Sequence, residues 1–80
     1  MTYDAEHRRL DREHGLNIAY SAGWEWGAQN LVWDEVIIRH DDILFDTDLW
    51  KQARAGYKVG YNARITRSPE FLAFVEAGIA

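Results

Sequence analysis

The sequence predicts a mainly α-helical fold, a bundle of four or five short helices in a single domain spanning residues 1–80. Three observations predict it. Small and apolar residues recur on a 3.6-residue period along most of the chain. Two segments repeat a glycine–aromatic pattern at helical spacing. A Ser-Pro-Glu sequence near the C-terminus is typical of a helix start. The alternative is an α+β fold with one β-hairpin between residues 32 and 45.

The first predicted helix, Tyr3 to His14, is short and highly charged. Its charged residues are spaced for ion pairs between successive turns, at Asp4–Arg8 and Arg9–Glu13. A thin stripe is expected to face inward, formed by Tyr3, His7, Leu10 and His14. Gly15 is expected to end this helix in a left-handed conformation.

The central predicted helix, Leu49 to Ile65, has one face that is almost bare of side chain. That face consists of Leu49, Ala53, Gly56, Gly60 and Ala63. Glycine inside a helix costs roughly 1 kcal/mol relative to alanine. Two such glycines are therefore tolerable only if another segment approaches this backbone closely.

The predicted helix Leu16 to Gln29 offers that segment, because both helices contain one pattern, 33 residues apart. The two copies read Ala22-Gly23-Trp24-Glu25-Trp26-Gly27 and Ala55-Gly56-Tyr57-Lys58-Val59-Gly60. Small residues four apart allow two helix backbones to approach closely. We expect the helices to cross at these glycines; the alternative is that each glycine only bends or ends its helix. The aromatic residues expected to close the crossing from the sides are Trp24, Trp26, Tyr57 and Tyr61.

The segment from Leu31 to His40 is compatible with two structures. As a helix, it has acids near its start and bases at its end, which suits the helix dipole. As a strand, it contains the run Val36-Ile37-Ile38, and Asp41-Asp42 would turn the chain into Ile43-Leu44-Phe45. We favour the helix, because no glycine supplies the positive φ of a tight hairpin.

Polar residues mark the remaining helix ends. Asn30 offers either a helix stop or a new N-cap, and Asp46 or Thr47 is expected to cap the central helix. Ser68 and Pro69 are expected to start a last short helix. Its buried side is predicted to be Phe71, Leu72, Phe74 and Val75, and Gly78 is expected to end it.

Composition excludes several classes of protein. The 80 residues carry a net charge of −4 and no cysteine, so a disulfide framework and a thiolate metal site are not available. The charge also makes direct, non-specific nucleic-acid binding unfavourable. No stretch resembles a signal peptide or a membrane span. We therefore expect a cytoplasmic protein without membrane association.

Candidate catalytic and metal-binding residues are few. His7 and His14 are too far apart on their helix to form a metal pair, and His40 beside Asp41 and Asp42 is explained by its place at a helix end. The aspartates of residues 41–48 do not follow the ligand spacing of a calcium loop. We therefore expect no enzyme activity, no metal and no cofactor.

Charge divides instead into two adjacent runs. The acidic run is Asp34, Glu35, Asp41, Asp42, Asp46 and Asp48. The basic run is Lys51, Arg54, Lys58, Arg64 and Arg67. The acidic run is interleaved with Ile43, Leu44 and Phe45, which is a pattern suited to binding a basic protein surface. The basic run has Tyr57 and Tyr61 alongside, which suits contact with RNA phosphates and bases.

The two glycine–aromatic segments, together with Leu49-Trp50, resemble ribosome modulation factor. That family consists of small two-helix proteins with Gly-Tyr-x-x-Gly and Trp-x-x-Gly-Trp turns of helix. The resemblance implies a ribosome- or RNA-associated module that uses the basic run. The family is strongly basic, however, whereas this chain is acidic.

In kind, the chain is similar to small phage-encoded inhibitors such as anti-CRISPR proteins, because it is short, acidic, rich in aromatic residues and without a catalytic pattern. We therefore expect a non-enzymatic inhibitor whose acidic run occupies a basic, nucleic-acid-binding surface of a protein complex. The RNA-associated module is the alternative. The sequence does not predict the oligomeric state.

Overall fold

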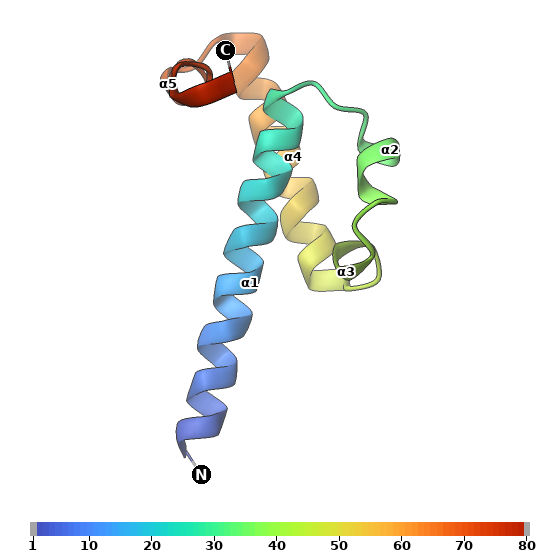
Figure 1. Cartoon of the computed structure of the whole chain (residues 1–80), viewed down its shortest axis with the longest axis vertical. Coiled ribbons are helices and arrows are strands. Elements are labelled where there is room, and N and C mark those ends of the chain that lie inside the picture. The colour runs from blue at the N-terminus through green and yellow to red at the C-terminus, as the bar shows by residue number, and fades with distance from the viewer. Residues whose placement is uncertain (1, 80) are drawn as a thin grey trace.

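The computed structural model describes the backbone of residues 2–79 and the side chains of residues 8–78. Over residues 2–79 the chain forms five α-helices and no strand (Figure 1). The helices are α1 (Thr2–Ala28), α2 (Trp33–Ile37), α3 (Asp41–Leu44), α4 (Thr47–Thr66) and α5 (Pro69–Phe74), with a π-helical turn at Val75–Ile79. The helical prediction is confirmed, and the alternative hairpin between residues 32 and 45 is not formed.

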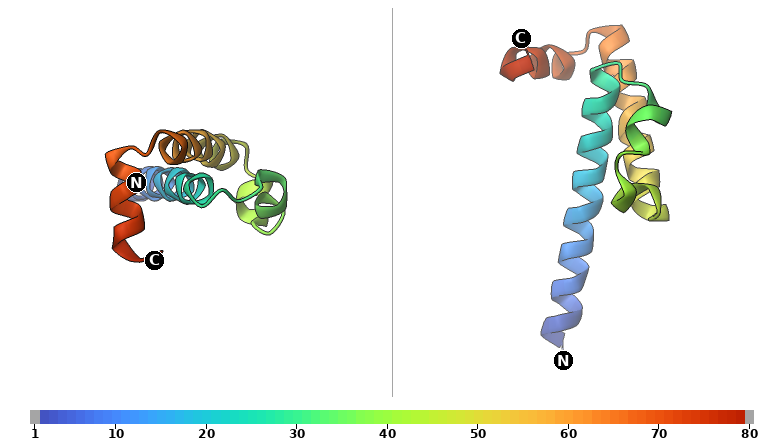
Figure 2. Two further views of the ribbon diagram at one scale, coloured as in Figure 1. Left: turned by 90° about the horizontal axis from the view of Figure 1, so that it is seen from above. Right: turned by 45° about the vertical axis from the view of Figure 1, so that its right-hand side comes forward.

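The fold is built on α1 and α4, which have 27 and 20 residues. The two helices lie side by side and run in the same direction (Figures 1 and 2). Because α4 is parallel to α1, the chain must return along the pair before α4 can begin. The connecting segment with α2 and α3 makes this return, so residues 29–46 all lie along one side of the helix pair.

Four glycines allow the close contact between α1 and α4. A methyl group on any of them would overlap a carbonyl oxygen of the opposite helix, in the pairs Gly23 with Ala53, Gly27 with Tyr57, Gly56 with Tyr20, and Gly60 with Trp24. Each glycine thus faces the carbonyl group three residues before its counterpart in the other helix. This reciprocal geometry directs glycine Cα–H groups at backbone oxygens, a weak but recurrent contact at helix interfaces. The predicted crossing at the glycines is confirmed.

A small core fills the angle between the helix pair and the returning segment. The buried residues of this cluster are Ala19, Trp26, Ile37, Ile43 and Ala53. Trp26 packs against the rings of Trp33 and His40, with ring centroids 6.1 and 4.7 Å away. On the other side of the pair, Trp24 makes an edge contact with Phe74 of α5. Aromatic contacts near the crossing therefore connect α2, and through Phe74 also α5, to the helix pair.

The sequence-based boundary at Gly15 is wrong, because α1 is one continuous helix from Thr2 to Ala28. Its first turns extend beyond the start of α4 without a neighbouring element (Figure 1). The inward stripe is therefore also wrong where side chains are described, since His14 is exposed and Leu10 is 50% exposed. The predicted pair Arg9–Glu13 is present at 3.0 Å. The side chains of Tyr3, Asp4 and His7, and with them the Asp4–Arg8 pair, lie outside the described residues.

The predicted helix ends are mostly confirmed. Asn30 takes a φ of 60° and stops α1, while Asp46 caps α4 and Ser68 caps α5. The predicted buried side of α5 is only partly correct. Its two phenylalanines are half-buried, whereas Leu72 and Val75 are exposed, because α5 projects away from the helix pair (Figure 2).

The glycine crossing gives a prediction for stability. Gly56→Ala places a methyl group against the backbone of α1, so we expect it to lower the free energy of unfolding by about 1–3 kcal/mol. Gly15→Ala is the matched control, because its methyl group would meet only Leu49 Cδ2, at 3.9 Å. Removing a flexible glycine there should stabilise the protein by about 0.4–1 kcal/mol. Urea unfolding of both variants measures the difference, and equal effects of the same sign would contradict the crossing.

Candidate functional site

The acidic run lies on the returning segment and at the start of α4. Asp34 and Glu35 are in the first turn of α2, and Asp41 and Asp42 are in the first turn of α3. All four are exposed and form no ion pair within the described side chains of residues 8–78. These four residues are called the acidic surface below.

The last two acids of the run have a structural role. Asp46 accepts two hydrogen bonds of 2.9 Å from the Arg12 guanidinium, which also reaches Asp48 at 3.1 Å. The same Asp46 carboxylate caps α4 by accepting backbone N–H groups of Asp48 and Leu49 at 3.1 Å. The hydrogen bonds from Arg12 and then Leu49 lower the pKa of Asp46 to about 2. The structure thus places Asp46 and Asp48 in a clamp between α1 and α4.

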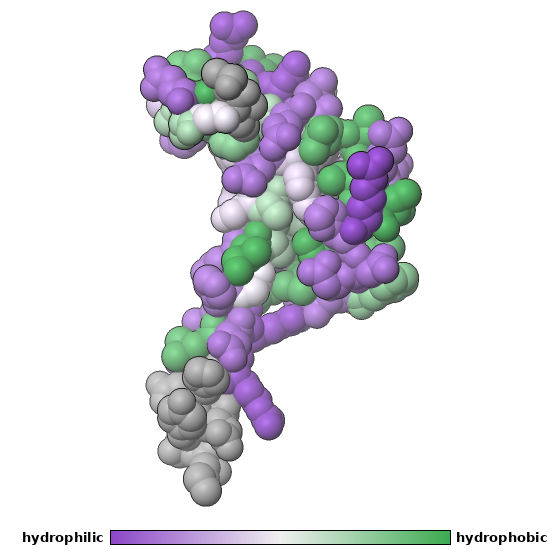
Figure 3. Space-filling view, viewed as in Figure 1, coloured by the Kyte–Doolittle hydropathy of each residue, from purple (hydrophilic) through white to green (hydrophobic). Residues whose placement is uncertain are grey.

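Apolar side chains accompany the acidic surface. Ile43, which the sequence analysis grouped with the acidic run, is in the core, and Leu44 is half-buried. Phe45 is 82% exposed and Ile38 is 64% exposed. In the space-filling view, apolar residues gather over α2 and α3 (Figure 3). The returning segment therefore combines exposed carboxylates with exposed apolar side chains.

The basic run does not form one patch. Lys51, Arg54 and Lys58 follow one side of α4, whereas Arg64 lies in its last turn. Arg67 ends α4 in a left-handed conformation with φ of 52°. Arg54 and Lys58 line a common pocket. The structure therefore divides the predicted RNA-binding residues into a pair at a concave site and three residues elsewhere on α4 or at its end.

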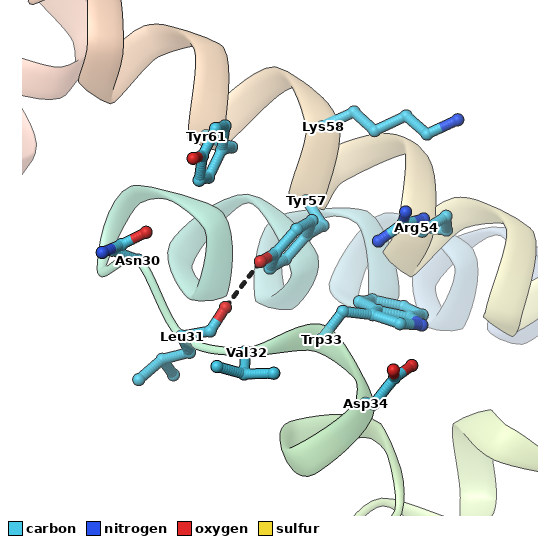
Figure 4. A pocket seen from close by; sticks show the side chains of 9 residues that line it. All are labelled: Asn30, Leu31, Val32, Trp33, Asp34, Arg54, Tyr57, Lys58 and Tyr61. Atoms are coloured by element: carbon cyan, nitrogen blue, oxygen red, sulfur yellow. Dashed lines mark hydrogen bonds between the residues drawn. The ribbon is translucent and has the colours of Figure 1, made fainter.

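That pocket has a volume of about 580 Å³ and opens between α4 and the chain leading into α2 (Figure 4). Its lining residues are Asn30, Leu31, Val32, Trp33, Asp34, Arg54, Tyr57, Lys58 and Tyr61. The Tyr57 hydroxyl donates a hydrogen bond of 2.5 Å to the carbonyl oxygen of Leu31. This bond ties the connecting chain to α4 and fixes one wall of the pocket.

The Arg54 guanidinium lies against two aromatic rings of this pocket. Its central carbon is 5.1 Å from the ring centroid of Trp33 and 5.3 Å from that of Tyr57. The sequence places Tyr57 and Tyr61 alongside the basic run, but nothing in it indicates that Trp33 lies there. Trp33 and Arg54 lie on different helices, and Trp33 is outside the two glycine segments that predict the α1–α4 crossing, so its contact with Arg54 depends on the return path of the chain.

His40 and the carboxylates beside it do not form a metal-binding group. The imidazole ring packs on Trp26. Within the described part of the chain, no group of three or more histidine, cysteine or acidic residues is suited to hold a metal ion. Among the helices as described, none combines the length and apolar character of a membrane span.

Comparison with protein-family models, with curated proteins and with solved structures finds no match to this chain. The resemblance of the glycine segments to ribosome modulation factor therefore stays a prediction.

The clamp on Asp46 gives a prediction for pH. Its folded pKa of about 2 is below the ordinary value of 3.8, so the stabilisation is present above about pH 4 and is lost as the pH falls toward 2. We expect Arg12→Gln to lower stability at neutral pH and to lose less stability on acidification than the wild type. Urea unfolding across this pH range measures how the free energy of unfolding of each protein changes with pH. The same pH dependence in the variant and the wild type would show that Arg12 does not hold the carboxylate.

Proposed function

We propose that this protein is a non-enzymatic inhibitor, of the phage or mobile-element type, that binds another protein. Its acidic surface would occupy a basic, nucleic-acid-binding surface of that partner, as anti-CRISPR-like inhibitors do in kind. The observation that supports the proposal most is the position of Phe45, 82% exposed at the end of α3 beside exposed carboxylates.

The carboxylates supply steering and selection. Four exposed acids without ion pairs among the described side chains present negative charge on two short helices. Complementary charge speeds association and disfavours partners of the same sign, although it contributes less to affinity itself. Such an array best fits a partner whose own surface binds phosphate groups.

The apolar side chains supply the anchor. Binding energy at protein interfaces is concentrated in a few residues that fill pockets of the partner, commonly aromatic ones. Phe45 and Ile38 are large, apolar and mostly in water. Burying these two side chains in an interface would remove apolar area from water. The carboxylates of the acidic surface do not contribute binding energy in this way.

The test begins with affinity capture from the native host and identification of the bound protein by mass spectrometry. We expect Phe45→Ala to weaken binding to the captured partner by about 2 kcal/mol, roughly thirtyfold. The double change Asp41→Asn and Asp42→Asn should mainly slow association, and raised salt should do the same. Binding kinetics on the purified partner measure both effects.

Matched controls lie on the opposite side of the helix pair. Leu72→Ala removes an apolar side chain that is 48% exposed, and Glu76→Gln removes an exposed carboxylate. Both should leave affinity unchanged. Asp46 is not suitable for charge reversal, since it caps α4. The proposal is refuted if the partner binds the Phe45 and aspartate variants as tightly as it binds the wild type. It is also refuted if excess nucleic acid fails to displace this protein from the partner.

A further inference from the structure

The pocket between α2 and α4 has aromatic faces that the acidic surface does not use. Trp33 and Tyr57 meet edge to face with ring centroids 5.4 Å apart. Tyr57 and Tyr61 are nearly parallel, at 21° with centroids 6.2 Å apart. Tyr61 is 39% exposed and stands at the mouth of the pocket (Figure 4). Its ring offers a face on which a flat ligand can stack.

Positive charge lies beside these rings. Arg54 is held over Trp33 and Tyr57, and Lys58 extends outward at the rim (Figure 4). Neither cation forms an ion pair within the described side chains of residues 8–78. The single carboxylate in the lining is Asp34, next to Trp33. Asp34 lies at the same end of the pocket as Arg54, with the Trp33 ring between them (Figure 4). A ligand phosphate would therefore lie on the Arg54 and Lys58 face of Trp33, across the indole ring from Asp34.

A hydrogen-bonding group completes the site. Asn30, held by its left-handed backbone at the end of α1, lines the pocket near Tyr61 (Figure 4). Its side-chain amide carries both a donor and an acceptor. That combination matches the edge of a nucleobase, which likewise presents donors and acceptors side by side.

We propose that this pocket binds a nucleotide, with the base stacked on Tyr61 and the phosphate at Arg54 and Lys58. A quaternary ammonium ligand does not fit, because Arg54 already covers the rings that would surround it. A purely apolar ligand would cover the half-buried Arg54 guanidinium without offering it a partner, which is unfavourable. The nucleotide is either a free molecule or one unit of a single strand. Both present the same base and phosphate to the pocket.

The test uses the whole protein and small probes, so its result does not depend on the inhibitor proposal. The Trp33 indole proton is followed by NMR during titration with AMP, adenosine, inorganic phosphate and a short oligoadenylate. We expect saturable shifts with AMP and weaker binding of adenosine and phosphate. An oligoadenylate that binds more tightly than AMP identifies a strand as the source, and equal affinity identifies the free nucleotide. No shift at millimolar AMP and oligoadenylate would overturn the proposal.

Variants separate stacking from charge. Tyr61→Leu should weaken AMP binding about tenfold. Lys58→Gln should weaken AMP binding and leave adenosine binding unchanged. Lys51→Gln is the matched control, because Lys51 is an exposed cation of the same helix outside the pocket. Equal loss of AMP affinity in the two lysine variants would overturn the proposal, since it would indicate attraction to general positive charge. Thermal melts confirm that each variant is folded.

Discussion

Close backbone contact at four glycines is the constraint on which the rest of this structure depends. The contact brings α1 and α4 together in parallel, and a parallel pair requires a connection that returns along its length. The returning segment carries Trp33 and the acidic surface, so both are placed by the direction of α4 and not by their own preference for structure. With short helices of five and four residues, α2 and α3 depend on packing against the pair to persist.

The division of charge seen in the sequence becomes a division of roles in the fold. Asp46 and Asp48 bind Arg12 and hold the first turn of α4 against α1, while the four acids before them remain in water. Of the basic residues, Arg54 is drawn onto aromatic rings and Lys58 stays free at the rim. Acidic and basic features therefore meet along the line where α2 packs against α4, with Asp34 at their boundary.

Local patterns predicted the parts of the fold that local physics controls. The glycine spacing predicted the crossing of α1 and α4, and the cap residues Asp46 and Ser68 predicted the starts of α4 and α5. The prediction of a helix end at Gly15 was wrong. A glycine after a charged stretch is typical of a helix end, but here the turns after Gly15 pack on α4, which keeps the helix continuous. Periodicity does not encode the relative direction of two helices, so the meeting of Trp33 with Arg54 was beyond sequence reasoning.

The reciprocal contacts of the glycines have a further consequence. Each helix presents two glycines to the carbonyl groups of the other, as two identical helices would in a symmetric parallel dimer. In this chain both copies belong to one polypeptide, with residues 29–46 as the tether. Tethering turns an association between molecules into an intramolecular one. The helix pair therefore forms independently of protein concentration, and the tether is free to carry recognition chemistry that a dimer of bare helices would lack.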